Sequence, residues 1–174
     1  MRTDARSLVA LVLVLGGAVG VAACSGGSGG SSLSDAEFCE RSGEFLEDGW
    51  NVGNPDAKVE EGTASDDGRV GTSVLCAFTG DDDFGGTLLV SKSSQPLTIA
   101  GASERVSVGA DVVAVEDRES YQPQFVVRID DWNGKMTLSS TEPSRTQPRA
   151  DPPTDAQVRA AAQALVDAVH AVAG

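Results

Sequence analysis

The order of hydrophobic and polar residues divides the chain into an apolar leader, two amphipathic segments and a strand-rich region between them. Apolar residues run almost without a break from Leu8 to Val21. From Ser34, and again from Thr154, apolar positions recur at the spacing of a helix with one buried face. Between these segments, apolar and polar residues alternate, as they do along a half-buried strand. The pattern predicts a helix, an antiparallel sheet and a second helix.

Both predicted helices begin with a capping box. Ser34 is followed by Glu37, and Thr154 by Gln157, at the spacing that lets two side chains satisfy free backbone amides. The first helix ends near Gly49, and its buried stripe consists of Ala36, Phe38, Cys39, Ser42, Phe45, Leu46 and Trp50. The stripe of the second helix is thin, which predicts close packing on the sheet; it consists of Val158, Ala162, Leu165, Val169 and Val172.

The region between the helices predicts strands joined by short turns. The strands are Val70–Thr79, Phe84–Ser91, Glu104–Val108, Val112–Asp117, Gln124–Trp132 and Lys135–Thr141. Val59 marks a short additional strand. The predicted fold is therefore α+β: an N-terminal helix, an antiparallel meander of about five or six strands and a C-terminal helix, with both helices on one sheet face.

The last predicted hairpin has the strongest turn signal, because Asn-Gly suits a type I′ turn. A loop at Asn133-Gly134 places Trp132 opposite Lys135, on the polar outer face of the sheet. An exposed tryptophan is able to anchor a partner, so Trp132 is a candidate contact residue. The alternative is that Trp132 covers the end of the sheet or stacks on Arg128 or Lys135.

The apolar leader has the layout of a secretory signal. Arg2 and Arg6 give it a positive start, and small residues precede Cys24 at its end. The sequence Val21-Ala22-Ala23-Cys24 resembles the lipobox of bacterial lipoproteins. The resemblance implies that residues 1–23 are removed and that Cys24 is diacylated, which would anchor the protein to the extracytoplasmic face of the cell membrane. Two alternatives are an ordinary secretory signal with an incidental cysteine and an uncleaved membrane anchor.

The rest of the chain is predicted to form one domain behind a flexible tether. Residues 24–33 hold Cys24 and a Gly/Ser-rich tether, residues 34–174 form the domain, and the proline-rich residues 142–153 connect the sheet to the last helix. The full chain has a net charge of −13. Without the leader, 11 basic and 25 acidic residues remain. Such a surface repels nucleic acid and anionic lipid headgroups, so we expect neither as a partner.

Cys39 and Cys76 are predicted to form a disulfide. An exported protein meets an oxidising environment, where an even pair of cysteines favours a bridge. Cys39 lies on the buried stripe of the first helix, and Cys76 shares a strand face with Val74 and Phe78. The bridge closes a loop of about 37 residues, which contributes about 4 kcal/mol in the chain-entropy treatment.

Candidate chemistry is sparse. The chain contains a single histidine, His170, so a Ser-His-Asp triad would have to rely on this solvated residue near the C-terminus, and His-based zinc sites are not expected. Asp81, Asp82 and Asp83 form a predicted hairpin tip, either simply solvated or binding a divalent cation weakly. We therefore expect no enzyme activity and no cofactor. An envelope hydrolase would need one carboxyl group with a raised pKa in a sheltered cleft.

The sequence favours a membrane-anchored binding or accessory module that contacts a protein of the cell envelope. The alternative is a lipid or small-molecule carrier with an apolar cavity between helices and sheet. The predicted helix-to-strand disulfide and the Ala-rich C-terminal helix also resemble small surface lipoproteins of high-GC Gram-positive bacteria, many without an assigned activity. That resemblance implies a non-enzymatic role and transfers no functional residues.

Overall fold

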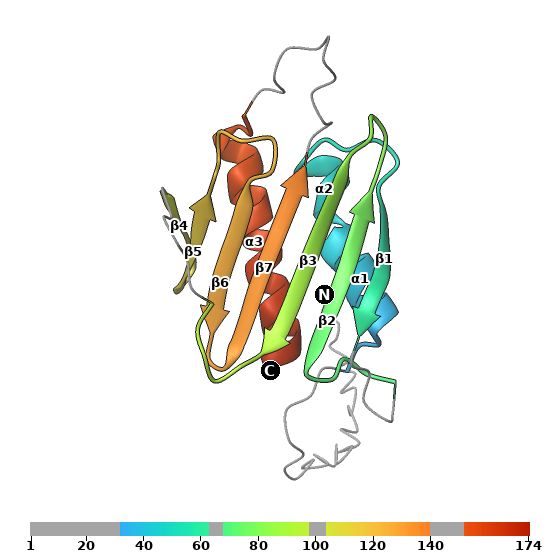
Figure 1. Cartoon of the computed structure of the whole chain (residues 1–174), viewed down its shortest axis with the longest axis vertical. Coiled ribbons are helices and arrows are strands. Elements are labelled where there is room, and N and C mark those ends of the chain that lie inside the picture. Colours follow the sequence, from blue (N-terminus) through green and yellow to red (C-terminus); the bar gives the residue numbers. More distant parts are fainter. Residues whose placement is uncertain (1–31, 63–67, 98–103, 140–151) are drawn as a thin grey trace, which may run out of the picture.

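The computed structural model describes residues 32–62, 68–97, 104–139 and 152–174. Within these residues the protein is an α+β fold, with its helices on one face of a seven-stranded antiparallel sheet (Figure 1). The predicted lipobox, the tether up to residue 31 and residues 142–151 of the predicted connector lie outside the described residues.

The sheet consists of two meanders that join at its centre. The strands are β1 (Asp56–Gly62), β2 (Ser73–Thr79), β3 (Gly85–Lys92), β4 (Glu104–Val108), β5 (Asp111–Glu116), β6 (Gln124–Ile129) and β7 (Trp132–Ser139). Their order is β1-β2-β3-β7-β6-β5-β4, so β3 pairs with β7 and not with β4. The prediction of five or six strands in one meander is therefore wrong.

The strand missing from the predicted count is β1, at one edge of the sheet. Its side chains are mostly exposed and charged, so it lacks the apolar alternation that marks a half-buried strand. In the sequence, only Val59 indicated this strand.

The helices begin as their capping boxes predict. The elements are α1 (Asp35–Gly43), α2 (Phe45–Asp48) and α3 (Asp155–Ala173). The Glu37 amide donates to Ser34 Oγ over 3.3 Å, and the Ser34 amide donates to Glu37 Oε2 over 3.0 Å. Thr154 and Gln157 make the equivalent pair of bonds at the start of α3. The predicted first helix is divided in two, because α1 ends at Gly43 and α2 follows Glu44.

The core lies between the helices and the inner face of the sheet. α1 packs on β1 and β2, while α3 packs mainly on β6 and β7. The predicted disulfide between Cys39 and Cys76 is confirmed, and it joins α1 to β2. The buried inner-face side chains of the sheet include Val74, Cys76, Phe78, Leu88, Val90, Val113, Val115, Phe125, Val127, Ile129, Trp132, Met136 and Leu138.

The turn between β6 and β7 is not where the Asn-Gly signal placed it. Ile129 pairs with Trp132, so the loop consists of Asp130 and Asp131. Asp130 has a φ of 54°, a left-handed conformation that aspartate adopts more readily than most residues. The prediction of a loop at Asn133-Gly134 is wrong.

Gly134 serves helix packing instead of a turn. It lies inside β7, under α3, and a Cβ atom there would stand 2.5 Å from Val169 Cγ2 and 2.9 Å from Leu165 Cδ1. These distances are too short for real contacts, so glycine lets α3 approach the sheet. The adjacent Asn133 is buried and donates from Nδ2 to the Gln95 carbonyl oxygen over 2.9 Å.

Candidate functional site

Trp132 is buried, which overturns its predicted exposure. The shifted turn moves Trp132 from β6 to β7, and there its side chain faces the core, with only 5% of its surface exposed. Lys92 Nζ lies 5.8 Å from the centre of its ring, within the range of a cation–π contact. Trp132 therefore closes one end of the core and is not an accessible contact residue. Trp50 is also buried, as predicted, against Phe125.

The three adjacent aspartates do not form a ligand set. Asp81 Oδ2 accepts a hydrogen bond from Asn54 Nδ2 over 2.7 Å, and the Asp81 amide donates to the Gly53 carbonyl oxygen. Asp82 and Asp83 adopt left-handed φ angles of 57° and 56° in the β2–β3 turn. In the described part of the chain, no three His, Cys, Asp or Glu side chains converge in a way that would hold a metal ion. Asp81 instead ties the turn to the segment before β1.

His170 forms a surface pair. Its Nε2 lies 2.9 Å from Asp111 Oδ2, which joins α3 to the start of β5. The imidazole is 54% exposed. A contact this exposed contributes little to stability.

A groove along β1 is the most distinctive surface feature of the described residues. It has a volume of about 720 Å³ and runs between the outer flank of α1–α2 and the sheet edge. We call it the edge groove. Its apolar lining consists of Ala36, Gly43, Leu46, Pro55, Ala57 and Val59. Val59 is one of the few large hydrophobic side chains left exposed, at 38%.

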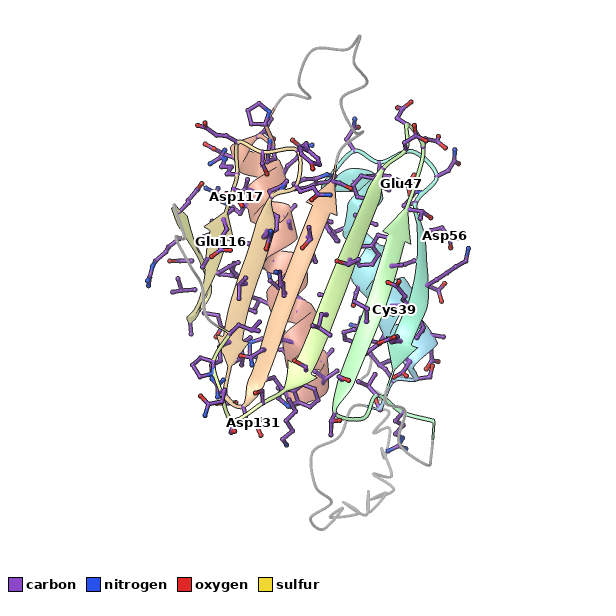
Figure 2. The ribbon with its side chains drawn as sticks, viewed as in Figure 1. Cys39, Glu47, Asp56, Glu116, Asp117 and Asp131 are labelled. Carbon is purple, nitrogen blue, oxygen red and sulfur yellow. A yellow bond between two sulfur atoms is a disulfide. The ribbon has the colours of Figure 1, made fainter. Side chains whose placement is uncertain are left out.

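The edge groove has an acidic rim. Four carboxylates line it, from Glu40, Glu44, Glu47 and Asp56, while Lys58 is the cation in the lining. Lys58 forms an exposed ion pair with Asp56. In the part of the chain that the structure describes, Glu40, Glu44 and Glu47 have no ion-pair partner. The groove therefore combines an apolar floor with uncompensated negative charge. Figure 2 shows Glu47 and Asp56 on this side of the molecule.

One wall of the edge groove is visible in the sequence as a helical pattern of glutamates. Glu40, Glu44 and Glu47 recur at helical spacing, so they share the face of the first helix opposite to its buried stripe. Such a charged face is the ordinary signature of a solvated helix surface. This face becomes one wall of a groove only because β1, which pairs with β2, lies beside α1.

A second groove separates α1 and α2 from α3. Its volume is about 930 Å³, and Phe38, Phe45 and Ala164 contribute to its lining. Charges of both signs surround it, including Arg41 and Asp167. Its carboxylates outnumber its cations, so charge there also favours a cationic ligand, but among the described residues no strand of the sheet contributes to its lining.

The groups with shifted pKa values lie outside the edge groove's lining. Arg118 Nη1 stands 2.8 Å from Glu104 Oε2, and Arg118 also pairs with Asp155 at the start of α3. The hydrogen bond from Arg118 lowers the pKa of Asp155. Partial burial raises the pKa of Asp35 in the first turn of α1. The Arg118 cluster links β4 and the β5–β6 loop to α3, which is a structural role.

Comparison with known proteins identified no similar protein. A scan against protein-family models and searches of curated proteins and of solved structures found no match. Among the described residues, no helix is both long and apolar enough to cross a membrane.

Proposed function

We propose that the protein is a lipid-anchored binding module of the cell envelope, without enzyme activity, that holds a cationic segment of a partner protein in its edge groove. The edge groove is the observation that carries this proposal. Its apolar floor offers contact area, and its carboxylates select the sign of the partner's charge. The lipobox resemblance supports the location, since acylation of Cys24 would hold the domain at the membrane surface.

The distribution of charge supports a protein partner over a lipid surface. The chain is strongly acidic overall, and the edge groove adds three glutamates that no cation of the described residues pairs with. Anionic headgroups would be repelled from such a surface. A basic segment of a neighbouring envelope protein would instead be attracted before contact and oriented along the groove.

The carrier alternative receives less support from the geometry. It requires an enclosed apolar cavity between helices and sheet. Leu165 and Val169 of α3 are fully buried against an inner sheet face that is itself buried. The two grooves described above lie at the surface and are rimmed by charged groups.

Photo-crosslinking in living cells tests the proposal. A photoreactive amino acid at Val59, in the edge groove, should crosslink to a Lys- or Arg-rich segment of an envelope protein. Val112 on β5 is the matched control site, because it is 49% exposed and lies outside the groove.

Charge variants make the crosslinking test specific. Glu44→Gln/Glu47→Gln should reduce the crosslink about fivefold, since each exposed charge pair contributes up to about 1 kcal/mol. Asp117→Asn/Glu119→Gln removes two exposed carboxylates from the loop that follows β5 and should leave the crosslink unchanged. Figure 2 shows Asp117 on the opposite side of the sheet from Asp56. Equal crosslinking in both variants, or products formed only with lipid, would overturn the proposal.

A further inference from the structure

The free side of β1 gives the edge groove a second means of recognition besides charge. In the described residues, β1 is the end strand of the sheet and pairs only with β2. An end strand presents backbone N–H and C=O groups on its outer side, and these can pair with another extended chain. The register shifts between Val59 and Glu61, which confines the regular part of this edge to Asp56–Val59.

The side chains of β1 alternate between the two faces of the sheet. Ala57 and Val59 pair with Phe78 and Cys76, whose side chains are buried on the inner face, so Ala57 and Val59 face the helix side. An added strand would lie about 4.8 Å from β1 and would follow the same alternation. Every second side chain of that strand would therefore point toward α1 and α2.

The helical wall offers carboxylates at intervals somewhat shorter than the side-chain repeat of an extended strand, a difference that long lysine and arginine side chains can bridge. Glu40 and Glu44 lie four residues apart, about 6 Å along a helix axis, and Glu47 follows about 4.5 Å later. Alternate side chains on an extended strand are about 6.7 Å apart. Lysine or arginine at every second position would thus meet the glutamates in succession, while the backbone pairs with β1.

We propose that the edge groove binds an extended segment with lysine or arginine at alternate positions, which adds to the sheet beside Asp56–Val59 as an eighth strand. This inference rests on the proposed function, because it specifies how the cationic partner is held. Strand addition supplies main-chain hydrogen bonds for affinity and side-chain alternation for specificity. A second copy of this chain is a poor occupant, since its own Asp56 and glutamates would face those of the first.

Synthetic peptides bound to the full-length protein in detergent test the pairing. The probe is an eight-residue peptide of alternating lysine and threonine, and its control has the same composition with all lysines together. The alternating peptide should bind about tenfold more tightly, and it should slow hydrogen exchange of the Asp56–Val59 amides.

Backbone methylation separates strand pairing from charge attraction. N-methylation of one set of alternate residues removes the N–H groups that face β1 and should weaken binding about tenfold. Methylation of the other set should leave binding nearly unchanged. Glu44→Gln/Glu47→Gln should weaken the unmethylated peptide, whereas Asp117→Asn/Glu119→Gln should not.

Three results would each contradict a different part of these proposals. Equal binding of both methylated peptides, with no slowed exchange in β1, would overturn strand pairing and leave a groove that attracts cations by charge alone. A concentration-dependent dimer protected at β1 would overturn it in favour of a second copy. Loss of the charge dependence of the cellular crosslink would instead overturn the proposed function itself.

Discussion

Gly134 lies under α3, at a point where the helix leaves no room for a Cβ atom. The facing residues of α3 include Leu165 and Val169, both fully buried, and alanines occupy much of the rest of the contact. A glycine in a strand usually weakens it, because glycine loses more backbone entropy and packs no side chain. Here that cost is offset by the close approach of a helix whose apolar stripe is thin.

Gly134→Ala should therefore destabilise the protein by about 1–3 kcal/mol through overpacking. Denaturant unfolding measures the effect as a lower midpoint with an unchanged slope. In a Val169→Ala background the same substitution should cost less, because the nearest atom, Val169 Cγ2, is gone. An alanine variant as stable as the parent would show that α3 does not depend on this gap.

At the scale of elements, the ends of helices are held by specific polar contacts. Both capping boxes form, and Arg118 additionally joins the start of α3 to β4 through Asp155 and Glu104. Arg118 also donates to the Pro153 carbonyl oxygen over 3.2 Å. These bonds fix where α3 begins after the predicted proline-rich connector.

The Arg118–Asp155 pair should make stability depend on pH in a defined direction. The pKa of Asp155 is lowered from its ordinary value of 3.8, so the folded state favours the ionised form. The contribution is present above pH 3.8 and is lost as the pH falls through the lowered pKa. Asp155→Asn should therefore be less stable than the parent at pH 6, and the difference should become smaller at pH 2.

Urea unfolding at the two pH values measures this convergence. Arg118→Met should approach the parent over the same range, because it removes the cation that lowers the pKa of Asp155, and should keep a pH-independent deficit from the lost bond to the Pro153 carbonyl oxygen. A constant difference between Asp155→Asn and the parent at both pH values would exclude the pair as the source.

Element types were predictable wherever local chemistry determines them. Capping boxes use side chains three residues apart, and Cys39 and Cys76 each lie on a clear buried stripe, so the sequence predicted both features. The position of the last turn was not predictable from the sequence. Asn-Gly suggests a turn, but Gly134 is needed inside β7 because α3 leaves no room there for a side chain. The edge groove was missed for a similar reason. Its walls come from separate elements, and β1 carries almost no apolar signal.

At the scale of the whole molecule, the core and the proposed binding site share the helix-covered side of the sheet. The helices cover one face of the sheet, and β1 lies at one edge of it (Figure 1). The edge groove runs along that strand. The Cys39–Cys76 disulfide joins α1 to β2 and so holds the glutamate-bearing wall close to the neighbour of β1. The anchor at Cys24 would present this groove near the membrane surface.

Cys24→Ser should release the domain from the membrane into the medium, because the hydroxyl cannot take the place of the acylated thiol. Fractionation followed by mass measurement checks both location and processing. Mature parent protein should carry acyl chains on Cys24, with Cys39 still joined to Cys76. An unmodified Cys24 in mature parent protein would contradict the anchor.

The meeting of β3 with β7 has a consequence for how the chain assembles. Lys92 pairs with Trp132 and Gly85 with Ser139, so the central ladder of the sheet joins two distant parts of the sequence. A chain that emerges N-terminus first presents β1, β2 and β3 long before β7 appears, and during that interval β3 is an unprotected border open to mispairing. Oxidation of the cysteines can already secure this first half. We therefore expect the slowest stage of maturation to be the arrival of the second half, which converts that temporary border into the middle of the finished sheet.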